Sequence, residues 1–149
     1  MYMQIKIEIK KLDEKAIIPT YGTEYSAGAD LHALLEEPIT IAPGETKLIH
    51  TGLAIAIPEG FVGLNFARSG MATKRGLAPA NKVGVIDSDY RGEVMVALYN
   101  QGNIPQTVEN GDRIAQIVFV PYYTADFILK DELSDTVRGA GGFGSTGTK

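Results

Sequence analysis

The sequence predicts an all-β domain, a sandwich or barrel with at most one short helix. Apolar and polar residues alternate over short segments, turn residues separate these segments, and glycines bracket the one segment that could be helical. At 149 residues, 44% of them hydrophobic, the chain has the size of one domain and can bury a core. We therefore expect a single soluble globular domain, with no internal repeat or linker within residues 1–135.

Strand follows strand along the sequence. In residues 5–10 isoleucine alternates with lysine or glutamate, which predicts a half-buried strand. Further strands are expected at residues 46–57, 61–67, 82–87, 92–100 and 113–120. Turn clusters such as Ala-Pro-Gly-Glu, Pro-Glu-Gly and Glu-Asn-Gly-Asp separate them.

Two segments depart from simple alternation. The only expected helix lies near residues 70–76, where the flanking glycines limit it to about two turns. The run Ile-Val-Phe-Val at residues 117–120 is apolar throughout, which is typical of a strand buried on both faces. In a small domain such burial can be against another subunit.

Composition excludes several classes of function. The chain has no cysteine, so disulfides and thiolate metal sites are excluded and a reducing compartment is permitted. His32 and His50 are isolated, and neither is expected to bind a metal. The N-terminus lacks a continuous apolar segment, so a cytoplasmic protein is expected. A net charge of -4 argues against a broad nucleic-acid surface but not against a nucleotide, because charge is screened over about 8 Å.

The C-terminal residues 138–147 combine five glycines with Arg138, Phe143 and two hydroxyl residues. Glycine lets backbone N–H groups approach an anion, and arginine adds a forked donor. The run matches dinucleotide-binding and P-loop spacings, but only Thr148 and Lys149 follow it, so no helix can begin there. We expect one β domain in residues 1–137 and a flexible arm in residues 138–149, which is either a disordered terminus or an arm that orders on a ligand.

Four more segments place glycine beside charged or amide residues: 26–31, 68–70, 81–93 and 111–116. Residues 68–70, Arg-Ser-Gly, offer a cation, a hydroxyl and a backbone N–H after a strand. This set suits a phosphate, although an ordinary turn with a solvated arginine would look the same.

The segment 81–93 is expected to be a hairpin with an acidic tip between two apolar strands. Its carboxylates, Asp87 and Asp89, could each act as a base, and spacing alone does not choose between them. Gln116 interrupts an apolar strand, which fits either a structural hydrogen bond or contact with a ligand.

Taken together and in order, the five segments resemble the trimeric deoxyuridine triphosphatase (dUTPase) family. The corresponding motifs begin at residues 27, 67, 81, 111 and 138 and read AGADLHA, ARSGMA, NKVGVIDSDYRGE, GDRIAQ and RGAGGFGSTG. One departure is Ala67, where the family commonly has proline, and this change removes no functional group.

The resemblance implies a distorted jelly-roll fold assembled as a homotrimer, with active sites at subunit interfaces and a swapped C-terminal arm. It implies hydrolysis of dUTP to dUMP and pyrophosphate by attack of water on the α-phosphorus, which limits uracil in DNA and supplies dUMP for thymidylate synthesis. Mg²⁺ would be held by the substrate phosphates and water rather than by protein ligands.

The resemblance also implies a role for each matching residue. Asp87 would activate the water. The phosphate chain would be contacted by Arg68, Ser69, Gly70 and Gln116. Uracil would be read by Asn81 and by the backbone at Gly84 and Val85, and Tyr90 would pack on the deoxyribose. The arm would supply Phe143 to stack on uracil and hold the γ-phosphate with Arg138, Gly144, Ser145 and Thr146. Asp30 would support the site without touching the substrate.

Other interpretations stay open at this point. A dCTP deaminase, or its bifunctional relative, shares the fold and binds a related nucleotide. A non-catalytic protein could use the same pocket as a nucleotide-dependent switch, and a purely structural trimer would bind no nucleotide.

Overall fold

The structure, a computed structural model, describes residues 4–145. This part of the chain consists of short strands and one seven-residue helix, α1 (Ser69–Arg75). The strands are β1 (Glu8–Lys11), β2 (Thr20–Tyr21), β3 (Ala29–His32), β4 (Ile39–Ile41), β5 (Thr46–Ala56), β6 (Phe61–Phe66), β7 (Leu77–Pro79), β8 (Gly84–Ile86), β9 (Glu93–Asn100), β10 (Gln106–Val108) and β11 (Arg113–Pro121). The all-β prediction is confirmed.

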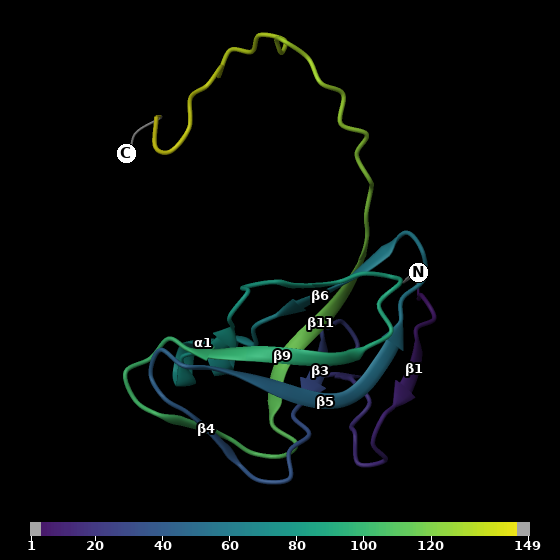
Figure 1. The fold of residues 1–149 in the computed structure, drawn as a ribbon, viewed down its shortest axis with the longest axis vertical. Coiled ribbons are helices and arrows are strands. Elements are labelled where there is room, and N and C mark those ends of the chain that lie inside the picture. The colour runs from purple at the N-terminus through teal and green to yellow at the C-terminus, as the bar shows by residue number, and fades with distance from the viewer. Residues whose placement is uncertain (1–3, 146–149) are drawn as a thin grey trace.

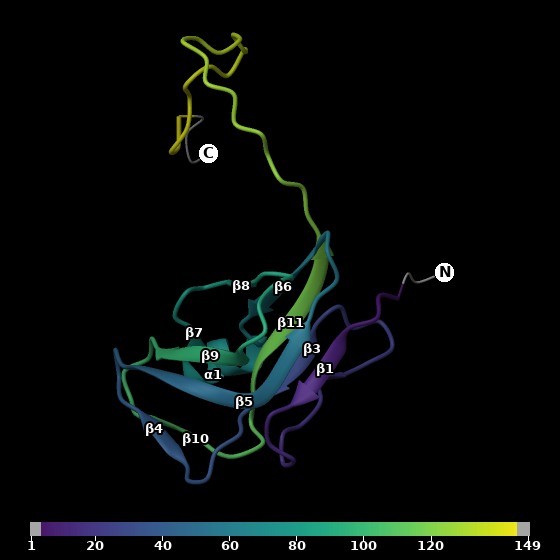
Figure 2. The ribbon, with the colours of Figure 1, turned by 45° about the vertical axis from the view of Figure 1, so that its right-hand side comes forward.

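Two main antiparallel sheets face each other (Figures 1 and 2). One has four strands in the order β1-β5-β9-β7, and the other has five in the order β2-β3-β11-β6-β8. A small third sheet pairs β10 with β4. Most neighbours in these sheets are distant in sequence, so the chain repeatedly crosses from one layer to the other.

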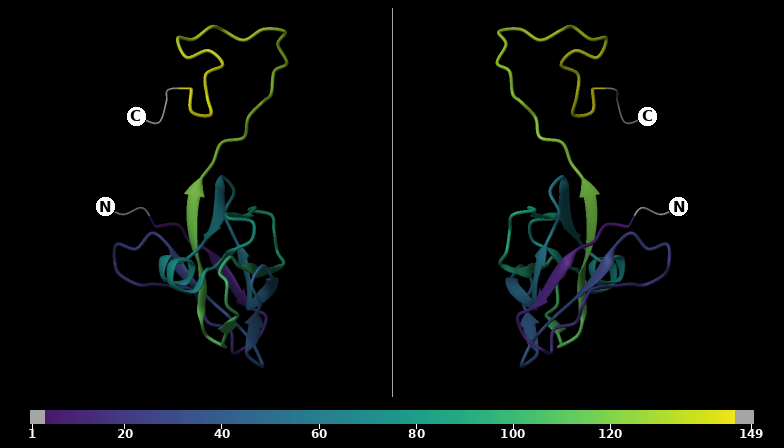
Figure 3. Two further views of the ribbon diagram at one scale, coloured as in Figure 1. Left: turned by 90° about the vertical axis from the view of Figure 1, so that its left-hand side faces the viewer. Right: turned by 90° about the vertical axis from the view of Figure 1, so that its right-hand side faces the viewer.

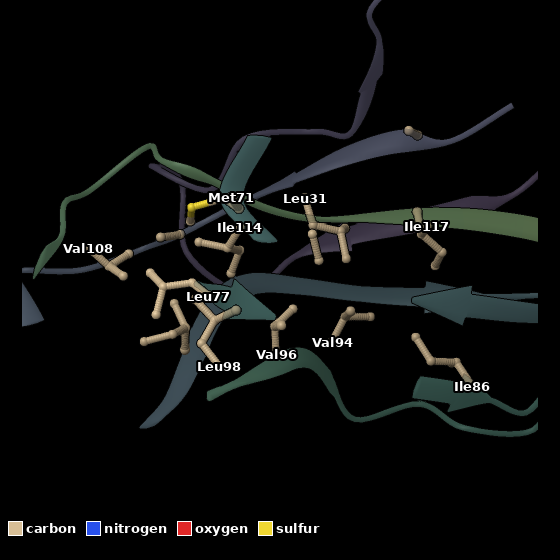
Figure 4. Packing of buried hydrophobic residues seen from close by; sticks show 14 of the residues in the cluster. Leu31, Met71, Leu77, Ile86, Val94, Val96, Leu98, Val108, Ile114 and Ile117 are labelled. Carbon is tan, nitrogen blue, oxygen red and sulfur yellow. The ribbon is translucent and has the colours of Figure 1, made fainter. Parts of the chain in front are cut away.

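The hydrophobic core lies between the two layers (Figure 4). In β9 every second residue is buried, which gives Val94, Val96 and Leu98 to the core from the four-stranded sheet. Leu31 and Ile117 meet them from the five-stranded sheet. This alternation follows from the two-residue period of a strand and explains why the pattern could be read in the sequence.

The predicted strands at residues 46–57, 61–67, 92–100 and 113–120 are confirmed to within one residue at each end. The first strand differs in extent, because β1 begins only at Glu8, where pairing with β5 begins. Burial nevertheless alternates from Gln4 to Lys10, as expected of a half-buried segment. Within the run 117–120 only Ile117 is buried, and the three residues after it are half-buried.

The predicted short helix is confirmed as α1, shifted by one residue from the expected 70–76. It ends at Gly76, whose φ of 65° lies in the left-handed region where a side chain is strained. The last helical residue, Arg75, ties the helix to the rest of the body. Its guanidinium donates to the carbonyl of Thr107 and lies 3.4 Å from the carboxylate of Asp112.

The hairpin predicted for residues 81–93 is wrong. Strand β8 pairs with β6 in the five-stranded sheet, whereas β9 pairs with β5 and β7 in the four-stranded sheet. Residues 81–92 therefore form a crossover segment between the layers, with the short strand β8 inside it. Alternation in sequence located the strands but carried no information on their partners.

The chain leaves the body after β11 (Figures 1 and 3). Residues 122–145 contain no helix or strand and run outward as an extended segment, which is called the arm from here on and begins before the arm predicted at residue 138. The arm exposes several large apolar side chains almost completely. They are Tyr123, Phe127, Leu129, Leu133, Val137 and Phe143. In the described residues no helix is long and apolar enough to cross a membrane.

Candidate active site

A cleft of about 390 Å³, here called the basic cleft, lies on the outer face of the five-stranded sheet. It gathers residues from three of the predicted motifs, which are far apart in sequence. Its lining includes Ser26, Gly28, Asp30, Phe66, Arg68, Ser69, Arg113 and Gln116. The structure thus brings together Arg68, Ser69 and Gln116, three of the residues predicted to hold phosphate groups, and Asp30, the carboxylate predicted to support them.

Asp30 orders the cations of the basic cleft. Its side chain is almost fully buried and accepts a hydrogen bond from Nε of Arg68 at 2.7 Å. Its other oxygen lies 3.5 Å from Nη1 of Arg113. Because the Nε–H of Arg68 donates its hydrogen bond to Asp30, the two terminal NH₂ groups of that guanidinium stay available to an anion.

The side chain of Gln116, which lies in β11, extends over the backbone of Gly28. Its Nε2 donates to the carbonyl of Ala67 at 3.0 Å, so the amide that interrupts the apolar strand is paired. A Cβ atom on Gly28 would lie 2.3 Å from Oε1 of Gln116, closer than real contacts allow. Gly28 is therefore required for the position of the Gln116 side chain.

Ser69 and Gly70 begin helix α1 beside the basic cleft, and both are exposed. No side chain caps this end of the helix. A second hollow of about 280 Å³ adjoins the cleft through the shared residues Arg68 and Arg113 and adds Lys74. Positive side chains therefore extend beyond the cleft itself, an arrangement that suits a ligand with several negative groups.

A separate cleft of about 310 Å³, here called the crossover cleft, is formed by the crossover segment against β6 and β9. Five residues with predicted roles line it together: Asn81, Gly84, Val85, Asp87 and Tyr90. Its remaining walls are largely apolar, from residues including Leu48, Ile86 and Val96. It offers one exposed carboxylate, one aromatic ring and an amide beside apolar surface, which suits a flat heterocycle.

Tyr90 is held against its own segment. Its hydroxyl donates to the carbonyl of Glu93 at 2.8 Å, and its backbone N–H donates to the carbonyl of Asp87 at 3.2 Å. A Cβ atom on Gly92 would lie 2.5 Å from the Tyr90 hydroxyl oxygen. The ring can fold back in this way only because residue 92 has no side chain.

Glu93 anchors the end of the crossover segment to β5. Its carboxylate accepts a hydrogen bond from the backbone of Gly52 and lies 2.8 Å from Nδ1 of His50. Burial works to raise the pKa of Glu93, but the hydrogen bonds from His50 and Gly52 outweigh it and hold that pKa below its usual value.

His32 belongs to the first motif and ends strand β3, two residues after Asp30 of the basic cleft. Burial lowers its pKa, an effect that Asp30 opposes and that Arg113 and Arg68 reinforce. The Nδ1 atom of His32 is buried without a hydrogen-bond partner among the described residues. In residues 4–145 no three carboxylate or imidazole groups come together as a metal site.

The two clefts lie on opposite faces of the five-stranded sheet. Consecutive side chains on a strand point to opposite faces, and Asn65 of β6 lines the crossover cleft while Phe66 lines the basic cleft. The register agrees, because Phe66 pairs with Gln116 and Asn65 pairs with Gly84. One copy of the chain therefore cannot offer both clefts to the same small ligand.

The predicted residues of the arm lie at neither cleft. Arg138 bonds within the arm, where its Nε donates to the carbonyl of Gly141 at 2.7 Å. Phe143 is fully exposed, and Gly144 and Ser145 are exposed next to it. The remaining predicted residue, Thr146, lies outside the described residues.

Arg113 and Asn65 line the clefts and are absent from the predicted set. Arg113 belongs to the fourth motif and reaches the basic cleft, where its charge pairs with Asp30. Asn65 is a buried amide in the crossover cleft. Asn65 interrupts an apolar strand, which is the signal that singled out Gln116 and could have found it, whereas Arg113 begins its strand after a polar turn.

Comparison with known proteins gives a consistent result. A sequence model of the dUTPase family matches residues 14–147. The chain is 53% identical over 146 residues to the deoxyuridine 5'-triphosphate nucleotidohydrolase of Desulfitobacterium hafniense strain DSM 10664 / DCB-2, covering 97% of both chains. It is 49% identical over 147 residues to the protein of the same name from Haemophilus influenzae strain PittEE, covering 95% of this chain and 97% of the relative.

Solved structures show the same jelly-roll fold. The dUTPase of Staphylococcus bacteriophage 80alpha, solved with dUPNHPP, superimposes with a TM-score of 0.88 at 29% identity, covering 97% of this chain and all of that one. A dUTPase variant from phage phi11 of S. aureus, whose structure describes the coordination of a structural Mg(II) ion, superimposes with a TM-score of 0.75 at 27% identity. That match covers 86% of this chain and 98% of the phage protein.

Proposed function

The chain belongs to the dUTPase family, and we propose that it hydrolyses dUTP to dUMP and pyrophosphate. The observation that carries the proposal is the crossover cleft, where Asn81, Gly84, Val85, Asp87 and Tyr90 line one space. The resemblance gives each of them a role in the family's reaction, and the cleft places polar groups beside apolar walls, as a pyrimidine nucleoside needs.

Asp87 is the proposed base. It is exposed at the crossover cleft, where a water molecule can reach it. It would orient a water whose oxygen attacks the α-phosphorus and would accept the proton that this water loses. The bond between the α-phosphorus and the bridging oxygen breaks, and pyrophosphate leaves. Asp89 lines a different hollow, beside Arg91, and is not at the crossover cleft.

The basic cleft would hold the phosphate chain. The terminal NH₂ groups of Arg68, the hydroxyl of Ser69 and the second N–H of the Gln116 amide are donors available to phosphate oxygens. Gly70 would present its backbone N–H beside them. Such prearranged donors stabilise the charge that moves onto the leaving pyrophosphate, the main contribution in phosphoryl transfer.

Mg²⁺ would reach this site with the substrate. The carboxylate of Asp30 is already engaged by two arginines, and the other lining groups we assign to phosphate are donors rather than metal ligands. Phosphate oxygens and water would therefore be its ligands, as is common for this ion. When bound, it would neutralise part of the phosphate charge.

Base and sugar would be recognised in the crossover cleft. Backbone groups at Gly84 and Val85 and the amide of Asn81 would pair with uracil, and a cytosine would leave some of these groups unpaired. The Tyr90 ring would pack on the deoxyribose and crowd a 2′-hydroxyl. From the arm, Phe143 would cover uracil, and the γ-phosphate would be held by Arg138, Gly144, Ser145 and Thr146.

A homotrimer would complete the site. The crossover cleft and the basic cleft face opposite ways, so a shared active site needs the crossover cleft of one copy against the basic cleft of another. The arm supports the same conclusion, because its exposed apolar side chains require cover that their own body does not give. A third copy would supply this arm.

The proposed reaction would limit uracil in DNA and supply dUMP, and the cytoplasm is its expected place. The decisive experiment measures pyrophosphate released from dUTP, dCTP, dTTP and UTP, with and without Mg²⁺. We expect release from dUTP alone and only with the metal. Ammonia from dCTP would instead identify a deaminase, and tight dUTP binding without turnover would identify a nucleotide-dependent switch.

A further inference from the structure

Strands β5 and β9 pair irregularly at the point where the crossover segment ends. Residues 51–53 of β5 stand opposite the single residue Val94 of β9, so the ladder contains a bulge. Gly52, in the middle of this bulge, has a φ of 69°. A bulge leaves backbone groups without partners in the ladder. The first residue of β9 is therefore not held by regular strand pairing alone.

Side chains make the missing bonds at the bulge. One carboxylate oxygen of Glu93 accepts a hydrogen bond from the backbone N–H of Gly52 at 2.8 Å, and the other lies 2.8 Å from Nδ1 of His50. The hydroxyl of Thr51 donates to the carbonyl of Val94 at 2.5 Å. Only 21% of the Glu93 side chain is exposed, so water competes little for its bonds. The Glu93 carboxylate therefore fixes the start of β9 against β5.

The backbone of Glu93 in turn holds Tyr90. The carbonyl of Glu93 accepts a hydrogen bond from the Tyr90 hydroxyl at 2.8 Å, and both residues line the crossover cleft. Tyr90 is 42% exposed, so packing alone does not hold its ring in place. The position of the ring thus depends on the Glu93 carboxylate, through the backbone between them.

We propose that Glu93 is a positioning residue for the discrimination between deoxyribose and ribose. This inference rests on the proposed function, in which the Tyr90 ring packs on the deoxyribose, and it adds a residue that acts through the ring rather than on the sugar. The bonds from Gly52 and His50 fix the start of β9, and the Glu93 carbonyl fixes the Tyr90 hydroxyl. The ring then leaves no room for a 2′-hydroxyl, whereas a ring free to shift would admit ribose.

The measured quantity is the preference for dUMP over UMP, given by the ratio of their inhibition constants against dUTP hydrolysis. Glu93→Ala removes the carboxylate and should lower this preference about tenfold. Glu93→Gln should stay within about threefold of wild type, because its amide oxygen can accept from Gly52 and its NH₂ group can donate to His50. Pyrophosphate has no sugar, so its inhibition constant should be the same for wild type and Glu93→Ala.

Glu45 provides a matched control. Its carboxylate makes the same two kinds of bond, from the backbone N–H of Ala42 at 2.9 Å and to Nζ of Lys47 at 2.7 Å, but it lies outside the lining of the crossover cleft. Glu45→Ala should therefore leave the preference for dUMP unchanged. An equal fall in both alanine variants would assign the effect to general loosening of the fold and overturn the role of Glu93.

Tyr90→Phe removes the hydroxyl at the other end of the same bond. Because Tyr90 is exposed, this variant should fold even if Glu93→Ala does not, and it should lower the preference by a similar factor. Combined with Tyr90→Phe, Glu93→Ala should cause little further loss. Additive losses in the double variant would overturn the proposal, as would an unchanged preference in either single variant.

The two proposals fail in different ways. A wild-type protein that releases no pyrophosphate from dUTP contradicts the proposed function itself. An active wild type that prefers dUMP over UMP, together with a Glu93→Ala variant of equal preference, contradicts only the role of Glu93.

Discussion

The side chain of Gln116 occupies the space that a side chain on Gly28 would need, with Oε1 only 2.3 Å from the position of such a Cβ atom. These residues come from two motifs 88 positions apart, and the pairing of β3 with β11 brings them together. The position of the amide that we propose to bind phosphate thus depends on the absence of a side chain at Gly28, just before the neighbouring strand β3.

Gly28→Ala should displace Gln116 and lower kcat by about 10²-fold, the effect of misplacing a catalytic group by about 1 Å. Tm should fall by a few degrees as well, because the new Cβ would also lie 3.1 Å from Cβ of Gln116 and the hydrogen bond from Gln116 to the Ala67 carbonyl would be lost. Gly22→Ala is a matched control, since its Cβ would lie an unstrained 3.8 Å from Ser26 Oγ. Equal activity of the two alanine variants would contradict the role given to Gly28.

Gly92→Ala should move the Tyr90 ring, whose hydroxyl oxygen lies 2.5 Å from the new Cβ position. We expect kcat/KM for dUTP to fall about tenfold and discrimination against UTP to weaken, because the ring no longer crowds a 2′-hydroxyl. In a Tyr90→Ala background the same change should have little further effect. Additive losses in the double variant would show that residue 92 acts independently of the ring.

Subunits with complementary defects should restore activity together. Asp87→Asn disables the crossover cleft and Arg68→Ala disables the basic cleft, so each variant alone should be inactive. In trimers assembled from equal amounts of both, about a quarter of the sites combine two intact clefts, so about a quarter of wild-type activity should return. A mixture that stays inactive would mean that both clefts of one site belong to the same copy.

Deleting residues 138–149 should reduce kcat/KM by about 10²-fold or more, because the site loses the residues that would close it. Tm and the oligomeric state should stay unchanged, because Arg138 and Gly139 make hydrogen bonds only within the arm. Size-exclusion chromatography and thermal unfolding provide the control. Loss of the folded state on deletion would show that the segment has a structural role.

Stability should depend on the protonation of His32. Burial lowers the pKa of His32 below its ordinary 6.5, so the unfolded chain binds this proton more readily than the folded one. Its contribution to stability is complete above pH 6.5 and declines as the pH falls from there to the folded-state pKa. His32→Asn should flatten the change in Tm between about pH 7.5 and 5.5. An unchanged slope would assign the effect to other groups.

Local sequence was enough to find most elements, because turn residues and two-residue alternation act over a few positions. From local sequence alone, Gly76 marks the end of α1, and the alternating valines of β9 mark that strand. Local sequence could not show that β8 and β9 belong to different sheets, because the choice of strand partners depends on the packing of the whole chain.

The candidate site likewise has some features that local sequence predicts and others that depend on the folded chain. The order of the motifs indicates Asp87 and Arg68, but it does not show which residues of different motifs touch, so the contact of Arg113 with Asp30 is visible only in the folded chain. Asn65 lies outside every motif, and although it interrupts an apolar strand, only the folded structure shows that it lines the crossover cleft.

Strand β6 serves two clefts at once, through Asn65 on one face and Phe66 on the other. In the proposed trimer those clefts belong to two different active sites, so a mutation that distorts β6 in one copy damages two of the three. In a cell that makes both normal and mutant chains, the mutant would therefore behave as partially dominant. The loss of activity would exceed the fraction of mutant protein, and extra copies of the normal gene would only dilute the defect.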